Sequence, residues 1–173
     1  MTFGTNAHRG ETAPDFELPG TDGDGEFELY RLSDRGDAGA TVLVFYPFDF
    51  SPVCTTELCR FRDAEWLTMT PDVDVWAISR DGGYAHQRFV ETYDLSFPLL
   101  SDVEGRAVDR YDVRYDEFER HGGVAKRAVY VVDADRTIRY AWDTEDPYDD
   151  PDVSELAEVI ESLPRVSIDG ADD

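Results

Sequence analysis

Residues 41–59 read TVLVFYPFDFSPVCTTELC and contain the only two cysteines of the chain, Cys54 and Cys59. The apolar, β-branched and aromatic run from residue 41 to residue 46 predicts a central strand that is buried on both faces. A proline-bounded turn follows, and then a helix is expected over residues 53–67, with Cys54 in its first turn. Unpaired N–H groups at a helix start favour an anion. This position therefore predicts a nucleophilic thiol with a lowered pKa.

Strand and helix patterns alternate along the remainder of the chain. This order predicts an α/β protein with a mixed central sheet. We expect one domain over residues 13–164, between a loose arm at 1–12 and an acidic tail at 165–173. The expected strands are 15–18, 26–32, 73–78, 97–100, 127–132 and 137–142, with a Gly/Asp turn at 20–25. Further helices are expected near residues 85–93, 107–111 and 153–163. Asp150 and Pro151 are the expected cap and first position of the last helix.

Acidic residues dominate the charge of the chain. Its 173 residues include 39 Asp and Glu against 16 Lys and Arg, a net charge of −23. Such a surface repels nucleic acid and anionic lipid. It predicts a halophilic protein that stays dissolved in concentrated salt, or alternatively a binding face for a cationic partner. The absence of a long apolar segment and of an apolar N-terminal signal region predicts a cytoplasmic location without membrane association.

Five motifs follow one another in the order of a known family. They are APDFEL at 13–18, the Pro47–Ser51–Cys54 pattern, CTTELC at 54–59, FPLLSD at 97–102 and RAVYVVD at 127–133. Together they resemble the peroxiredoxins, most closely the bacterioferritin-comigratory-protein or peroxiredoxin Q branch, over about residues 10–163. The resemblance implies a thioredoxin-like fold and a thiol-dependent peroxidase that reduces hydrogen peroxide and organic hydroperoxides.

The same resemblance implies a role for each motif residue. Cys54 corresponds to the peroxidatic thiol, which attacks the peroxide as a thiolate. Arg127 corresponds to the arginine that stabilises this thiolate and the charge developing on the O–O bond, a task that suits a planar guanidinium. The Ser51 hydroxyl is expected to bind the peroxide, and Pro47 to cover the thiolate. Glu57 is expected to orient an arginine.

Each of these residues also has a simpler interpretation. Pro47 could merely end the strand, and Ser51 could be only a helix cap. Arg127 could be a surface residue in an ion pair. Glu57 could be a favourable acid in the first turn of the helix.

Cys59 is the partner that the resemblance implies for oxidised Cys54. On an ideal helix the two Cα atoms would be roughly 8–9 Å apart, whereas a disulfide needs less than about 7 Å. The helix start must therefore unwind before Cys59 resolves the Cys54 sulfenic acid as an intramolecular disulfide. The alternative is that Cys59 is a small buried hydrophobic residue. The family implies recycling by thioredoxin or a similar dithiol, no cofactor, and a monomer or weak dimer.

Three other functions compete with this interpretation. A thioredoxin-like thiol–disulfide oxidoreductase would use Cys-x-x-Cys and a proline before the strand facing the site, but residues 121–133 contain no proline. A metal site could use the cysteines and a histidine, but His8, His86 and His121 show no paired ligand spacing, and each is expected to face solvent. A non-enzymatic acidic binding protein would keep its activity without Cys54.

Overall fold

A seven-stranded sheet forms the centre of the protein in a computed structural model that describes residues 8–35, 38–64, 67 and 70–163. The sheet order is β2–β1–β5–β4–β3–β8–β9. The strands are β1 (Glu17–Thr21), β2 (Glu28–Arg31), β3 (Ala40–Phe45), β4 (Val73–Ser79), β5 (Leu99–Ser101), β8 (Ala128–Asp133) and β9 (Ile138–Asp143), with a separate hairpin of β6 (Glu117–Phe118) and β7 (His121–Gly122). The helices are η1 (Leu32–Asp34), α1 (Pro52–Asp63), α3 (Gly83–Tyr93), α4 (Arg106–Arg110) and α5 (Val153–Glu161).

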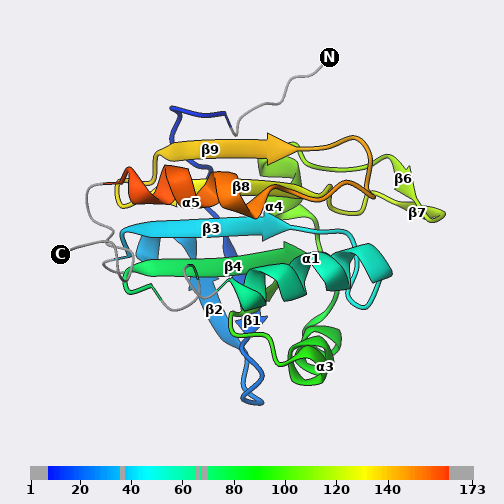
Figure 1. The fold of residues 1–173 in the computed structure, drawn as a ribbon. Helices are drawn as coiled ribbons and strands as arrows, with labels where there is room; N and C mark the ends of the chain where they lie inside the picture. The colour runs from blue at the N-terminus through cyan, green and yellow to red at the C-terminus, as the bar shows by residue number, and fades with distance from the viewer. Residues whose placement is uncertain (1–7, 36–37, 65–66, 68–69, 164–173) are drawn as a thin grey trace.

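The sheet is mixed and carries helices on both faces (Figure 1). β3 pairs in parallel with β4, and β4 with β5, whereas β8 runs antiparallel to both β3 and β9. This arrangement confirms the predicted α/β class and the thioredoxin-like fold.

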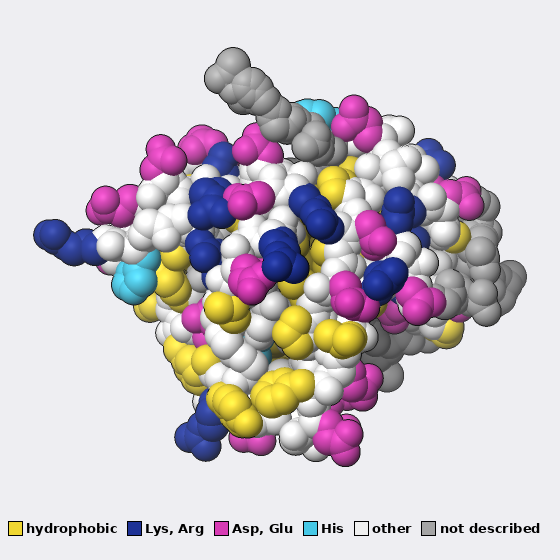
Figure 2. All heavy atoms as spheres, turned by 180° about the vertical axis from the view of Figure 1, so that it is seen from behind, with side chains coloured by type: hydrophobic (Ala, Val, Ile, Leu, Met, Phe, Trp, Pro, Cys, Tyr) yellow, Lys and Arg dark blue, Asp and Glu magenta, His cyan; other side chains and the backbone are white. Residues whose placement is uncertain are grey.

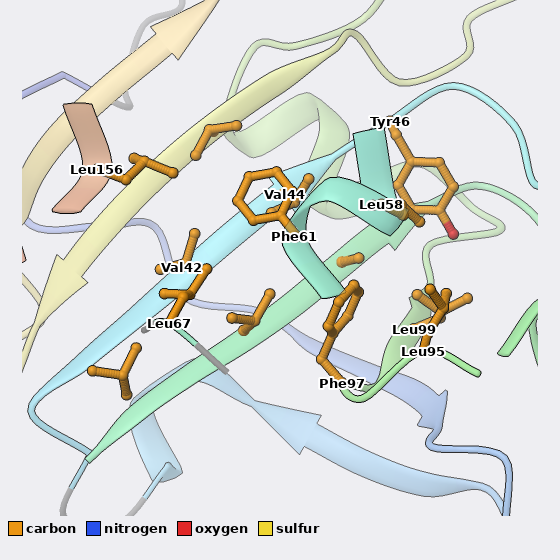
Figure 3. Packing of buried hydrophobic residues seen from close by; sticks show 14 of the residues in the cluster. Val42, Val44, Tyr46, Leu58, Phe61, Leu67, Leu95, Phe97, Leu99 and Leu156 are labelled. Atoms are coloured by element: carbon orange, nitrogen blue, oxygen red, sulfur yellow. The ribbon is translucent and has the colours of Figure 1, made fainter. Parts of the chain in front are cut away.

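β3 is buried along its whole length, as its unbroken apolar sequence predicted. Alternate side chains enter two cores, because neighbouring residues of a strand point to opposite faces. Val42 and Val44 pack in the core beneath α1, α3 and α5. Figure 3 shows Val44 beside Phe61 of α1. The side chains between them face the core that α4 covers.

Strand pairing brings two distant segments of the chain together at one end of the sheet. β3 runs into the loop that precedes α1, and Phe45 at its end pairs with Ala128 at the start of β8. The residue before β8, Arg127, therefore lies beside the loop that leads to Cys54, although the two residues are 73 positions apart. This end of the sheet is where the predicted site residues meet.

β1 lies further along the chain than the sequence pattern suggested. It spans residues 17–21 rather than 15–18, so Gly20 belongs to a strand and not to the predicted turn. Gly20 pairs with Leu100 of β5 and with Glu28 of β2. A Cβ atom at this position would lie 2.9 Å from the Tyr30 ring and 3.1 Å from the Leu100 side chain. Close packing, and not a turn, explains this glycine.

One predicted helix end and one predicted helix cap were wrong. α1 ends at Asp63 rather than at residue 67, because Ala64 leaves the helical conformation and its N–H bonds to the carbonyl of Phe61. The cap of α5 is Asp152, whose carboxylate accepts the N–H of Ser154. Asp150 instead binds Arg60 of α1, with 2.6 Å between Nη1 and Oδ2. β5 likewise spans residues 99–101 rather than 97–100.

The first described residues run along the β8–β9 hairpin. The Gly10 N–H donates to Ile138, the Ile138 N–H donates to Glu11, and the Ala13 N–H donates to Arg136. The expected acidic tail at 165–173 lies outside the described residues, as do residues 1–7 of the expected arm. Among the described residues, no helix is both long and apolar enough to cross a membrane.

We predict that Gly20→Ala lowers the free energy of unfolding by about 1–3 kcal/mol, the usual cost of overpacking. The new methyl group would press on Tyr30 and Leu100. Urea unfolding followed by circular dichroism measures the change. Gly82→Ala is the control, because no atom lies within 4 Å of the Cβ position there. Equal stability of the two variants would contradict this account of the packing.

Candidate active site

Cys54 lies in the first turn of α1 and is completely buried. Ser51 caps this helix, since its Oγ accepts the Cys54 N–H at 3.3 Å, and Pro52 occupies the first helical position. Proline suits that position because its missing N–H would have had no partner in the helix. The sequence therefore predicted the local placement of the thiol correctly. It also offered the cap as an alternative role for Ser51, and that cap is present.

Arg127 reaches the thiol from the start of β8. Its side chain has no solvent exposure, and its Nη2 donates to the Cys54 sulfur at 3.3 Å. Nη1 donates to Glu57 Oε1 at 2.6 Å, and Nε donates to the carbonyl of Pro147 at 2.9 Å. One guanidinium thus binds the thiol, a carboxylate and the backbone at once. The alternative that Arg127 is a surface residue is wrong.

Glu57 is buried beneath the same guanidinium. It lies beyond the first turn of α1 and is 1% exposed, which excludes the interpretation as a first-turn surface acid. Burial raises the pKa of Glu57 to about 7, although Arg127 opposes the rise. Among the described residues, its Oε2 has no hydrogen-bond partner. The expected contact between Glu57 and an arginine is present in the structure.

The pKa of the Cys54 thiol is raised, not lowered as the helix position alone predicted. Burial is the largest cause, because it removes the water that would solvate a thiolate. Arg127, the backbone N–H of Phe48 and the Ser51 side chain act in the opposite direction. The helix start is visible in the sequence, but the depth at which the fold buries it is not. The charge of Arg127 opposes this effect of burial most strongly, so the thiolate depends on it.

Pro47 and Phe48 connect the site to the surface. Pro47 is buried at the end of β3, and both residues line a groove of about 290 Å³ together with Arg80 and His121. Phe48 also contacts the ring of His121, with 4.8 Å between ring centroids. The loop that carries Pro47 therefore has the thiol on one side and an open groove on the other.

Cys59 is half-buried, and neither cysteine forms a disulfide. Both residues lie within α1, which is continuous from Pro52 to Asp63. The structure is therefore the intact-helix form of the cysteine pair. From this form a disulfide requires the first turn to unwind, as the helix geometry predicted.

The histidines do not share one environment. His8 and His121 are exposed, as expected, but His86 is completely buried, so its predicted exposure was wrong. His86 lies on the inner face of α3 and binds Asp49. Within the described residues, no group of three or more His, Cys, Asp or Glu side chains is arranged to hold a metal ion.

Sequence analysis missed the residues that support Arg127. The Tyr115 hydroxyl accepts the Arg127 N–H at 3.4 Å and donates to the carbonyl of Thr144 at 2.8 Å. Pro147 supplies the carbonyl that binds Nε. Tyr115 and Pro147 lie in segments whose sequence shows no site motif, because Tyr115 acts through one hydroxyl and Pro147 through its backbone carbonyl. Only the fold reveals them.

A buried thiol held by a guanidinium, in the first turn of a helix of a thioredoxin-like fold, defines a thiol-dependent peroxidase of the peroxiredoxin class. An arginine, and not a proline, precedes the strand that faces the thiol, which argues against a thiol–disulfide oxidoreductase. Residues 9–141 match the AhpC/TSA family, and the chain belongs to this family.

The similar proteins include peroxiredoxins of the Bcp type. A putative peroxiredoxin bcp of Coxiella burnetii is 35% identical over 136 residues, which are 77% of this chain and 86% of that protein. Peroxiredoxin Bcp of Bacillus subtilis is 33% identical over 136 residues, 77% of this chain and 83% of that one. The crystal structure of peroxidoxin BcpB from Mycobacterium tuberculosis has a TM-score of 0.72 at 30% identity, covering 89% of this chain and 94% of that one. The predicted resemblance is confirmed.

We predict that Glu57 makes stability depend on pH. Its pKa is about 7 in the folded protein, against about 4.5 for an unperturbed glutamate. The folded state therefore holds the proton more tightly, and stability falls as the pH rises between these two values. Glu57→Gln removes this decline, on the order of 1 kcal/mol per pH unit at most. Urea unfolding from pH 4.5 to pH 8 measures it.

The control for this experiment is Glu91→Gln, which changes an exposed glutamate on α3. It should retain the pH dependence of the unaltered protein. The account of Glu57 is wrong if the two variants show the same pH profile.

Proposed function

We propose that this protein reduces hydrogen peroxide and organic hydroperoxides through Cys54, forms a disulfide with Cys59, and is recycled by thioredoxin or a similar dithiol. The observation that carries the proposal is the contact of Arg127 with both Cys54 and Glu57 in a site closed to solvent. No step requires a cofactor. The family assignment supports the reaction class, and the geometry supports the choice of Cys54 as the reacting thiol.

In the first step the Cys54 thiolate attacks the terminal oxygen of the hydroperoxide. An S–O bond forms while the O–O bond breaks, and the remaining oxygen leaves with the bonding electron pair and takes up a proton. The products are a Cys54 sulfenic acid and an alcohol, or water from hydrogen peroxide. Arg127 is positioned to stabilise the thiolate before the attack and the charge on the oxygens during it, because a guanidinium can donate to two atoms at once.

Ser51 and Pro47 have supporting roles in this proposal. The Ser51 hydroxyl accepts the Cys54 N–H. Its own proton can be donated to the thiolate or to a peroxide oxygen. Pro47 is buried between the end of β3 and the groove, where it limits the entry of water. Glu57 orients the guanidinium, since it holds Nη1 while Nη2 faces the sulfur.

In the second step Cys59 attacks the sulfur of the sulfenic acid. An S–S bond forms, and the hydroxyl group leaves as water after taking the Cys59 proton. The first turn of α1 must unwind for this, which breaks the Ser51 cap and moves Cys54 away from Arg127. An external dithiol then reduces the disulfide by exchange.

We also propose that the protein works in a salt-rich cytoplasm as a monomer or weak dimer. Figure 2 shows acidic side chains around the outline of one face, with basic side chains interspersed. The net charge of −23 makes these acids repel one another when salt is low. Molar salt shortens the range of this repulsion to about 3 Å.

We predict three different products when the reduced protein meets one equivalent of hydrogen peroxide in molar potassium chloride. The unaltered chain should lose two hydrogens within seconds, because Cys54 and Cys59 join. Cys59→Ser should gain one oxygen, because the sulfenic acid cannot be resolved. Cys54→Ser should keep its mass. Intact mass spectrometry after rapid thiol blocking distinguishes them, and oxidation of Cys54→Ser at the rate of the unaltered chain would refute the assignment.

We predict that the free energy of unfolding rises when potassium chloride is raised from about 0.1 M to about 2 M. The cause is screening of the acidic surface, and urea unfolding measures it. A neutral osmolyte such as sucrose, added at the same osmolarity, is the control for general exclusion effects. Stabilisation by sucrose that equals or exceeds that by the salt would contradict the screening account.

A further inference from the structure

His86 is a buried histidine that the proposed reaction does not use. It lies on α3 with no solvent exposure, and both of its ring nitrogens meet oxygen atoms. Nδ1 lies 2.7 Å from Asp49 Oδ2, and Nε2 lies 3.0 Å from the backbone carbonyl of Leu100. The Asp49 side chain is 2% exposed, so water does not separate this pair.

The oxygens around the ring determine where its protons lie. A carbonyl oxygen only accepts hydrogen bonds, so Nε2 must carry a proton toward Leu100. Asp49 also accepts a hydrogen bond at its other oxygen, Oδ1, from the Tyr46 hydroxyl at 2.6 Å. Nδ1 and Oδ2 of Asp49 lie 2.7 Å apart and must share a proton, because two lone pairs would otherwise face each other. The ring therefore bonds to Asp49 on one side and to the Leu100 carbonyl on the other.

Asp81 is a further acidic group beside this pair. Its Oδ2 accepts the Asp49 N–H at 3.0 Å and the Ser79 hydroxyl at 2.6 Å. Burial and the charge of Asp49 raise the pKa of Asp81. The His86 ring therefore lies among two acids and a tyrosine hydroxyl, contributed by the loop after β3 and by the residues that follow β4.

These contacts hold the loop that enters the active site. Asp49 lies midway between Pro47 and Ser51, and the backbone N–H of the neighbouring Phe48 opposes the rise in the pKa of the Cys54 thiol. The next residue, Phe50, has a φ of 68°, a left-handed conformation that is strained for an aromatic side chain. A strained backbone persists only where its surroundings hold it. Here His86 binds the side chain of Asp49, and Asp81 accepts its N–H.

We propose that His86 is a positioning residue for the peroxide reaction, acting through Asp49 to hold the 46–51 loop in the conformation that places Phe48 and Ser51 against the Cys54 sulfur. The inference rests on the assignment of Cys54 as the peroxide-reducing thiol. Loss of the ring releases the loop and its strain. The first step then slows, because the groups that oppose burial of the thiolate lose their fixed positions.

Release of the 46–51 loop should speed the second step, in which Cys59 attacks the Cys54 sulfenic acid. Cys59 reaches Cys54 only when the first turn of α1 unwinds, and the 46–51 loop is the segment that holds this turn. A looser loop opens more often, so a larger fraction of sulfenic acid becomes disulfide before a second peroxide overoxidises it.

The test uses His86→Leu, Asp49→Asn, the double variant, and His8→Leu as a control at an exposed histidine. Stopped-flow measurement of Cys54 oxidation should show each single variant about tenfold slower, with the double variant within threefold of the slower one, because the pair acts as a unit. Mass spectrometry at high peroxide should show less overoxidised protein in His86→Leu than in the unaltered chain. Amide exchange should be faster at Asp49 and Phe50, and unchanged in the centres of β3 and β4.

Three results would overturn the inference: single variants within twofold of the unaltered chain, effects that multiply in the double variant, or faster exchange spread evenly over the sheet. Failure of the unaltered chain to react would instead refute the proposed function of Cys54. If the variants do not fold, nitrogen NMR of the unaltered, ¹⁵N-histidine-labelled protein still decides. A proton between His86 and Asp49 that exchanges with water as slowly as the Asp49 and Phe50 amides supports the inference, and a proton that exchanges much faster than these amides refutes it.

Discussion

The buried guanidinium of Arg127 is the interaction on which the site depends. A charge without solvent is costly, and it persists here because all three sides of the group have partners: the Cys54 sulfur, the Glu57 carboxylate and a backbone carbonyl. Removal of one member of such a buried pair typically costs about 3–5 kcal/mol. The arrangement also limits the charge at the site. Glu57 and a Cys54 thiolate share one cation, so ionisation of each group affects the other.

The sheet makes this interaction possible. β3 delivers the loop and the helix that carry Cys54, and β8 delivers Arg127 from a segment 73 positions later. Antiparallel pairing of the two strands sets their ends side by side, and the side chains that alternate along β3 join both cores. The stability of the centre of the protein thus maintains the distance between sulfur and guanidinium. The proposed disulfide step, by contrast, requires the helix start at the edge of this frame to unwind.

Sequence reasoning succeeded where the signal was local. The buried strand, the proline-bounded turn and the cysteine in the first helical turn follow from residues within one short stretch, and the motif order pointed to the family. It failed where burial or distant packing decided the outcome. The expected lowering of the Cys54 pKa ignored how deeply the helix start is buried, and His86 was assigned to the surface although it lies against Asp49, 37 positions away. Gly20 was read as a turn residue although the close approach of Tyr30 explains it.

By itself, the sequence determined the class of fold and the acidic character of the surface, and it predicted which thiol reacts. These depend on residue types, on local conformational preference and on motif order, which are properties of the linear chain. Only the tertiary structure decided that Arg127 and Glu57 meet at the thiol, that Tyr115 and Pro147 support the arginine, and that buried His86 binds Asp49 in the loop before α1. Such contacts join residues far apart in sequence, and their energies depend on burial, which no local pattern specifies.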